Sequence, residues 1–375
     1  PKAGQYKYTM SVSPLDCMGC GECVTVCPTA AIKMVPQETR LAEQPVWDYL
    51  VKNVSKKTDS GYADSTVKGS QFNQPLLEFS GSCAGCAETS YARLITQLFG
   101  ENMYISNATG CSSIWGGPAA TCPYTINKDS KKGPAWANSL FEDNAEHGLG
   151  MYVGQKFIRD SLIAKLNEIA SNCETSDSLK AAIAKFMETK DSTLDNVEPT
   201  KALIAELEKL DCSCKDEILE KKAYLNKKSV WIMGGDGWAY DIGFGGLDHV
   251  LASGENVNVM VFDTEMYSNT GGQASKASNI GEVCQFAAAG KEIGKKSLAE
   301  IAMSYGYVYV AQIALGANMN QALKAIKEAE AYKGPSLIIA YAPCINHGIK
   351  IGMSNTILEE KKAVDSGYWH LYRYN

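Results

Sequence analysis

The sequence predicts an α/β fold with a mainly parallel sheet, which carries a helical insertion and follows a short cysteine-rich segment. From residue 229 onward, short apolar runs rich in β-branched residues alternate with helical stretches, as a sheet buried on both faces requires. Residues 151–228 instead carry apolar side chains at helical spacing and charges of both signs between them. Residues 1–36 are turn-rich and dense in cysteine.

Composition excludes several classes of protein. The chain has 375 residues, of which 45% are hydrophobic and 21% charged, and its net charge of −6 argues against a basic nucleic-acid binder. Its 13 cysteines are too sparse for a secreted disulfide scaffold. We find no apolar run long enough to cross a membrane. From the charge we expect no nucleic acid as partner, and from the missing apolar run we expect no membrane. Since residue 1 is Pro, we expect further residues upstream.

Three stretches follow from these patterns, the last of them with a helical excursion. Residues 1–36 form the cysteine-rich segment, 37–75 a linker with little periodicity, and 76–375 the α/β domain with its helical excursion at 151–228. The predicted strands are Ser229–Met233, Asn256–Phe262, Tyr305–Ala311 and Ser336–Tyr341. The predicted helices of this domain are Glu88–Phe99, Gly246–Ala252, Leu298–Met303 and Met319–Ala331.

The first cysteine run has the spacing of bacterial ferredoxins. Cys17, Cys20 and Cys23 stand three residues apart, and Cys27 follows four residues later, directly before Pro28. In this spacing three thiolates bind one iron–sulfur cluster and the fourth binds another cluster. A zinc site would favour paired cysteines separated by a longer loop. The run therefore indicates iron–sulfur ligation that needs a second such run, which this chain does not contain.

A second set of cysteines leaves several interpretations open. Cys83 and Cys86 form a C-x-x-C pair, which suits a redox dithiol, half of a zinc site or half of a cluster site. Cys111 and Cys344 lie in loops where an α/β sheet gathers ligands, so a four-thiolate site is one possibility. The cysteines without an assigned role are Cys122, Cys173, Cys212, Cys214 and Cys284, and we expect no functional pair at 212 and 214.

Two strand ends carry a pattern typical of diphosphate and Mg²⁺ binding. Gly235-Asp236-Gly237 follows the first predicted strand of the domain, where glycines let the backbone approach a phosphate and Asp offers a hard oxygen. Thr264 follows the next strand. Together they resemble the thiamine diphosphate motif, although Asn is usual at the position of Thr264; two ordinary glycine-rich turns are the alternative.

Taken in order, the ferredoxin run, CAGC-x-E, CSSIWG, GGDGWAYDIG, DTEMYSNTGGQ and PCINHG resemble the C-terminal third of the pyruvate:ferredoxin oxidoreductase family. The resemblance runs from about residue 11 to the end. It implies a thiamine diphosphate-binding fold preceded by half of a ferredoxin-like domain for two [4Fe–4S] clusters. It also implies three such clusters in the full protomer, one of them held wholly within this chain.

The resemblance further implies roles for particular residues. The proximal cluster would be held by Cys83, Cys86, Cys111 and Cys344. Mg²⁺ would be held by Asp236, the Thr264 side chain and the Met266 carbonyl. Residues expected around thiamine diphosphate are Glu88, Cys111, Gly235, Asp236, Gly237, Trp238, Thr264, Glu265, Met266, Tyr267, Ser268 and Asn269. Asn269 would also face the substrate and take part in catalysis.

The activity implied is oxidation of pyruvate with coenzyme A to acetyl-CoA and CO₂, with electrons passed through the clusters to ferredoxin or flavodoxin. The resemblance also implies a homodimer in the cytoplasm of an anaerobe, with organellar targeting left open, and places further catalytic groups in upstream domains. An enzyme for 2-oxoglutarate or indolepyruvate is the nearest alternative. A non-redox thiamine enzyme and a plain electron carrier are the others.

Overall fold

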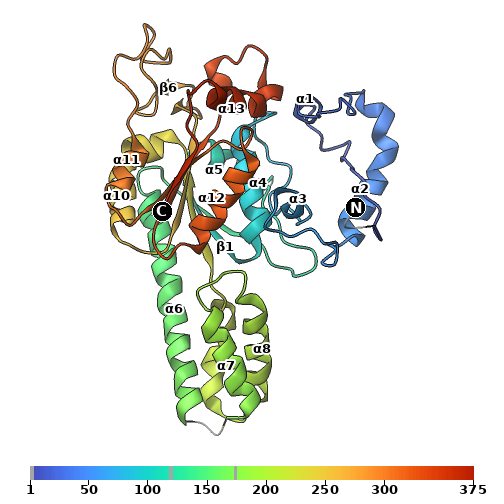
Figure 1. Ribbon diagram of the computed structural model, residues 1–375, viewed down its shortest axis with the longest axis vertical. Coiled ribbons are helices and arrows are strands. Elements are labelled where there is room, and N and C mark those ends of the chain that lie inside the picture. Colours follow the sequence, from blue (N-terminus) through green and yellow to red (C-terminus); the bar gives the residue numbers. More distant parts are fainter. Residues whose placement is uncertain (1–3, 118–120, 173–174) are drawn as a thin grey trace.

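The centre of the molecule is a mainly parallel sheet, as the sequence predicts. The computed structural model describes residues 4–117, 121–172 and 175–375, and across these ranges one sheet of seven strands forms the core (Figure 1). In sheet order its strands are β2 (Ala135–Ser139), β1 (Met103–Ala108), β3 (Ser229–Gly234), β4 (Asn258–Asp263), β8 (Ser336–Tyr341), β7 (Tyr309–Ile313) and β9 (Tyr372–Tyr374). Neighbouring strands pair in parallel except β9, which runs antiparallel to β7.

Helices cover both faces of this sheet because its side chains alternate between two apolar clusters. On one face, Trp231 and Met233 of β3 pack with α4 (Ala87–Phe99) and α12 (Met319–Ala331). On the other face, Ile232 packs with α10 (Phe244–Ala252) and α11 (Leu298–Met303). The four helices predicted in these regions are therefore confirmed, with ends shifted by at most a few residues.

The helical insertion forms a separate bundle beneath the sheet (Figure 1). It consists of α6 (Asn144–Asn172), α7 (Asp177–Thr189), α8 (Val197–Lys209) and α9 (Asp216–Glu220), around a core that includes Leu162, Phe186 and Leu203. The helical part was expected to begin at residue 151, but α6 begins at Asn144. Its first turns contain glycines of weak helix propensity, and packing on the sheet compensates for them.

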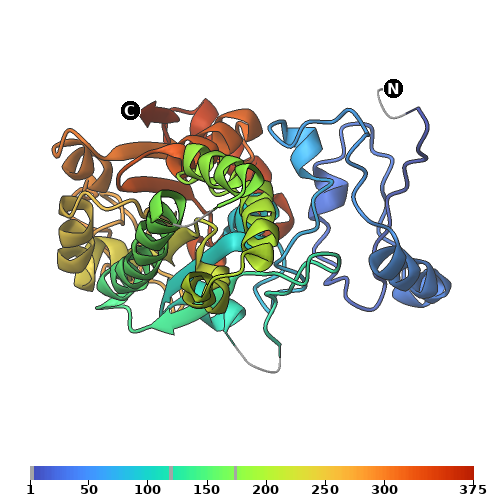
Figure 2. The same ribbon diagram turned by 90° about the horizontal axis from the view of Figure 1, so that it is seen from below.

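The N-terminal residues lie to one side of the sheet domain (Figure 2). They contain α1 (Glu22–Thr25), α2 (Gln44–Asn53) and α3 (Val67–Ser70), so the stretch predicted as an aperiodic linker is partly helical. Strands β1, β2 and β9 and helix α13 (Thr356–Asp365) were also not predicted. The strand expected at Tyr305–Ala311 lies at Tyr309–Ile313, after a turn. No helix in the described ranges combines the length and apolarity needed to cross a bilayer.

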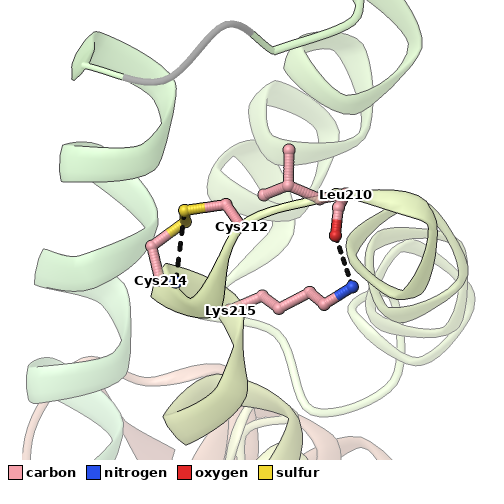
Figure 3. Close-up of a disulfide and its surroundings, with 4 residues drawn as sticks. All are labelled: Leu210, Cys212, Cys214 and Lys215. Atoms are coloured by element: carbon pink, nitrogen blue, oxygen red, sulfur yellow. Dashed lines mark hydrogen bonds between the residues drawn. A yellow bond between two sulfur atoms is a disulfide. The ribbon is translucent and has the colours of Figure 1, made fainter.

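One cysteine pair differs from expectation. Cys212 and Cys214 form a disulfide directly before α9, with their Cα atoms 5.2 Å apart (Figure 3). The Cys214 backbone N–H is 3.2 Å from the Cys212 sulfur, and Lys215 donates to the Leu210 carbonyl beside it. This disulfide was not predicted from the sequence, whereas the lack of a functional role for the pair stays a prediction. Cys122 and Cys284 are free thiols, and Cys173 lies outside the described residues.

A buried carboxylate joins the helical insertion to the sheet. Glu330 of α12 accepts hydrogen bonds from Thr193 at 2.6 Å and from the Asn258 side chain at 2.9 Å. It also accepts from the Ser229 hydroxyl, and the Lys227 ammonium lies 3.5 Å away. Four donors from three segments thus converge on one acid at the amino ends of β3 and β4.

We predict that Glu330→Ala destabilises the protein by about 2–4 kcal/mol, because it leaves several buried donors and one lysine without their acceptor. Urea denaturation followed by circular dichroism measures this difference. Lys324→Ala on the same helix, where the side chain is 61% exposed, should change stability by less than about 0.5 kcal/mol. Equal stability of the two variants would contradict this role for Glu330.

Candidate functional site

Four neighbouring strands end at the same edge of the sheet, and each leads to a predicted site residue. β1 is followed by Cys111, β3 by Asp236, β4 by Thr264 and β8 by Cys344. These strands are adjacent in the order β1-β3-β4-β8 and pair in parallel register. Ligand sites of open α/β sheets lie outside such carboxyl ends.

Three oxygen atoms from two of these loops come together. The Asp236 carboxylate accepts hydrogen bonds from the Thr264 backbone N–H at 2.8 Å and from its hydroxyl at 2.6 Å. The same hydroxyl is 3.1 Å from the Met266 carbonyl. The second carboxylate oxygen of Asp236 is buried and has no hydrogen-bond partner within the described residues. This set of hard oxygens, with one buried acceptor unsatisfied, fits a Mg²⁺ ion.

Buried charge surrounds this oxygen set. Burial, together with nearby Asp263, raises the pKa of Asp236 well above its usual range. The positive charge of Lys295 opposes that rise. The Lys295 ammonium lies 2.8 Å from Asp263 and 3.7 Å from Glu265. Burial alone would lower the pKa of Lys295, but these carboxylates outweigh it and raise that pKa. A cation is therefore already built into the acidic cluster behind the site, and Asp263 is the acid it contacts most closely.

The glycine-rich loop after β3 is tightly fitted. A Cβ atom on Gly237 would lie 2.3 Å from the ring of Tyr267, so only glycine fits there. Gly235 is less constrained, since its added Cβ would come only within 3.8 Å of another atom, the Phe262 carbonyl oxygen. Trp238 is buried in the core, and its indole N–H has no partner within the described residues. Glycine at position 237 is thus required by the Tyr267 ring, and glycines in such a loop also let its backbone approach a diphosphate.

The loop after β4 presents its residues in different directions. Glu265 is buried with a φ of 65°, and its carboxylate accepts from Tyr368 at 2.9 Å and from the Asn279 side chain at 2.6 Å. The Glu265 side chain is therefore engaged away from the oxygen set. Ser268 and Asn269 instead face the Cys111 thiol, with the Ser268 hydroxyl 3.3 Å from the sulfur.

The four cysteines predicted for one site are free thiols. Burial is the main cause of the raised pKa values of Cys86, Cys111 and Cys344, and the charge of a neighbouring cysteine adds to each rise: Cys111 for Cys86, Cys344 for Cys111 and Cys83 for Cys344. Burial raises the pKa of Cys111 to about 12 and that of Cys344 to about 11. Thiolates at such positions require a cationic partner, as an iron–sulfur cluster would provide.

A single metal ion fits this set less well. Among the described residues, no three histidine, cysteine or carboxylate side chains lie close enough together to share one ion. A cluster imposes a different requirement, because each thiolate binds a different iron and the sulfurs stand further apart. Four thiol donors are the chemistry that a [4Fe–4S] cluster requires, so this set of residues suits a cluster.

Glu88 connects the cysteine set to the core. It lies in the first turn of α4, directly after Cys86, and accepts a hydrogen bond of 2.9 Å from the Trp115 indole. Burial raises the pKa of Glu88 to about 7, while the Trp115 hydrogen bond opposes that rise. Trp115 belongs to α5 (Cys111–Gly116), so one hydrogen bond joins the helix that begins directly after Cys86 to the helix that begins at Cys111.

The cysteines of the first run form a separate group. Cys17, Cys20, Cys23 and Cys27 are free and at least partly exposed, on the loop and short helix α1. The Ala31 backbone N–H lies 3.3 Å from the Cys27 sulfur, and such hydrogen bonds lower the pKa of that thiol. Backbone donors around a sulfur are typical of iron–sulfur sites.

Sequence reasoning missed several residues that shape the site. The partly buried Lys295 and the buried Asp263 and Tyr240 form one unit, in which the Tyr240 hydroxyl donates to Asp263 at 2.6 Å. The Trp115 contact with Glu88 was also missed. Asp263 stood in the quoted motif and could have been noticed as an acid at a strand end, whereas nothing in the sequence marks Lys295.

The comparisons with known proteins agree with this geometry. Residues 220–340 match the family described as thiamine pyrophosphate enzyme, C-terminal TPP binding domain, and residues 10–33 match the 4Fe-4S binding domain. The chain therefore contains a thiamine diphosphate-binding domain and an iron–sulfur segment, and its predicted α/β class is confirmed.

Similar proteins are known from several bacteria. A pyruvate-flavodoxin oxidoreductase of Klebsiella pneumoniae is 53% identical over 100% of this chain, and a pyruvate:ferredoxin oxidoreductase of Moorella thermoacetica is 54% identical over 100%. A solved 2-oxoglutarate:ferredoxin oxidoreductase from Magnetococcus marinus shows a weak likeness, with 15% identity and a TM-score of 0.43 over 71% of this chain and 65% of that one. The chain spans 32% of the length of each of the first two relatives. It belongs to the family of pyruvate:ferredoxin (flavodoxin) oxidoreductases.

Proposed function

We propose that this chain forms the thiamine diphosphate-binding and electron-transferring part of an enzyme that oxidises pyruvate with coenzyme A to acetyl-CoA and CO₂. The named function of the curated relatives supports pyruvate as substrate. Two electrons leave the reaction and pass one at a time through [4Fe–4S] clusters to ferredoxin or flavodoxin. Because the relatives are about three times longer, the remaining catalytic groups belong to other parts of the enzyme.

One observation carries this proposal: a candidate cluster ligand touches the candidate cofactor loop. The Cys111 sulfur is 3.3 Å from the Ser268 hydroxyl and faces the Asn269 side chain. A thiamine enzyme without redox chemistry has no need of thiols at this position. A plain electron carrier has no need of the Asp236–Thr264 oxygen set.

The residues of the chain divide the work of holding thiamine diphosphate. When bound, this cofactor serves as an electron sink for breaking the carbon–carbon bond beside a keto group. Asp236, Thr264 and the Met266 carbonyl hold Mg²⁺ against the diphosphate, and Gly235 and Gly237 let the backbone approach it. Glu88 and Asn269 lie near Cys111, where Asn269 faces the substrate as a catalytic residue.

The cysteines provide the path for electrons. Cys83, Cys86, Cys111 and Cys344 hold the proximal cluster, while Cys17, Cys20 and Cys23 bind a second cluster and Cys27 a third. Ligands for these two clusters also come from a partner run outside this chain. The full protomer therefore holds three clusters, of which the proximal one is ligated wholly by residues of this chain.

The domain boundaries, the oligomeric state, the location and the partners are proposed from the family resemblance. We propose residues 1–36 as half of a ferredoxin-like domain, 37–75 as a linker and 76–375 as the thiamine diphosphate-binding domain. We further propose a homodimer that works in the cytoplasm. The absence of a strongly basic charge balance supports small molecules and an electron carrier as partners.

We predict that Thr264→Val weakens binding of thiamine diphosphate in the presence of Mg²⁺ by about tenfold or more, since losing one oxygen ligand costs at least about 1.4 kcal/mol. Titration calorimetry of the full-length enzyme, depleted of thiamine diphosphate beforehand, measures its affinity for the cofactor. Thr264→Ser keeps the hydroxyl and should bind as the unaltered protein does. If the Thr264→Val and Thr264→Ser variants bind thiamine diphosphate equally well, the Thr264 hydroxyl is not a ligand of Mg²⁺.

We predict that Cys344→Ala removes one cluster per protomer, seen as a loss of iron, of acid-labile sulfide and of one EPR signal after reduction. The proximal cluster then has only three thiolates and is lost or degraded. Cys122→Ala alters another free cysteine and is the matched control, with unchanged iron content. Full retention of iron and of all EPR signals in Cys344→Ala would refute the assignment.

We predict that the holoenzyme reduces ferredoxin with pyruvate and coenzyme A, and only weakly with 2-oxoglutarate or indolepyruvate. The measurement is ferredoxin reduction followed by absorbance, with each 2-oxoacid supplied in turn. Omission of coenzyme A should suppress steady turnover. Reduction by 2-oxoglutarate alone would overturn the choice of substrate in favour of the related oxidoreductases.

A further inference from the structure

A short segment of the chain lies against both sets of cysteines. We call residues 353–357 the bridge segment; they comprise η7 (Met353–Asn355) and the start of α13. The bridge segment follows Cys344 along the chain after a short loop. Thus β8, which is followed by Cys344, leads through this loop into the bridge segment.

One side of the bridge segment touches the loop between Cys83 and Cys86. A Cβ atom added to Gly85 would lie 2.3 Å from the Met353 carbonyl oxygen, and Gly85 has a φ of +83°. The buried Thr356 hydroxyl donates to the same carbonyl at 2.7 Å and fixes its direction. The Cys83–Cys86 loop can therefore approach the bridge segment this closely only because residue 85 is glycine.

The other side touches the first cysteine run. Helix α1, which carries Glu22 between Cys20 and Cys23, packs against η7 of the bridge segment. An added Cβ on Gly21 would stand 3.6 Å from the Ser354 Cβ. Residues from both cysteine sets thus contact a stretch only five residues long.

The bridge segment is itself held in place by α13. Glu360 of α13 is buried and accepts hydrogen bonds from the Gly316 backbone at 2.7 Å and from the Tyr91 hydroxyl at 3.2 Å. Tyr91 lies on α4, the helix that begins directly after Cys86. The same helix that follows the Cys83–Cys86 loop therefore anchors the segment packed on that loop.

We propose that the bridge segment is the spacer that sets the distance between the proximal cluster and the cluster of Cys17, Cys20 and Cys23, with Gly85 and Thr356 as positioning residues. The proposal rests on the proposed function and adds the route by which electrons leave the proximal cluster. In each transfer one electron leaves the reduced proximal cluster and enters the oxidised neighbouring cluster. No bond is formed or broken.

The test uses the full-length holoenzyme reduced with dithionite, so that it does not depend on any activity with pyruvate. Spin–spin interaction between two reduced clusters falls steeply with their separation and appears as splitting or broadening of the EPR signals. Gly85→Ala adds a methyl group against the Met353 carbonyl and should weaken or abolish this interaction while iron content is unchanged. Gly81→Ala, whose added Cβ meets no atom within 4 Å, is the matched control and should keep it.

A second variant keeps the proposal testable if Gly85→Ala loses iron–sulfur clusters. Thr356→Val lies outside both cysteine loops, keeps the side-chain shape and removes only the hydroxyl that fixes the Met353 carbonyl. It should reduce the interaction while all clusters remain. Unchanged splitting in Thr356→Val, and in Gly85→Ala with full iron content, would overturn the proposal. Failure to oxidise pyruvate with normal splitting would instead count against the proposed function alone.

Discussion

The parallel alignment of β1, β3, β4 and β8 is the constraint on which the other features depend. Since parallel neighbours end at the same edge, chain segments far apart in sequence deliver thiols and oxygens to one place. β3 and β4 bring Asp236 and Thr264 within hydrogen-bond distance. A shift of one residue in the register of either strand would turn these side chains to the wrong face.

The chemistry of the site arises from two kinds of donor placed next to each other. Hard oxygens occupy the centre of this edge, and soft sulfurs lie beside them on the loops after β1 and β8. The contact between Cys111 and Ser268 is where the two meet. Behind them, the Lys295 ammonium balances the negative charge of the buried carboxylates of Asp263 and Glu265. The acids next to the oxygen set are therefore not left as unpaired buried charges.

Much of the fold followed from local sequence pattern, and what was missed has identifiable causes. β1 was missed because its apolar run is broken by Ser106 and Asn107, which are buried and hydrogen-bonded, Ser106 to Asn144 and Asn107 to Ser112. The predicted strand at Tyr305 was misplaced because Tyr305 hydrogen-bonds to Asp248 in a turn instead of joining the sheet. The cysteine and glycine motifs could be found because their spacing along the chain is itself the signal. Lys295 could not, because its partners are brought near it only by folding.

The central claim is that an iron–sulfur cluster lies directly beside bound thiamine diphosphate. Pulsed EPR on the dithionite-reduced holoenzyme, loaded with thiamine diphosphate that carries ¹³C in its thiazolium ring, tests this most directly. We predict a dipolar coupling between the labelled carbon and the proximal cluster, which disappears when unlabelled cofactor is used. Absence of coupling to any cluster, with cofactor and clusters both bound in full, would contradict it.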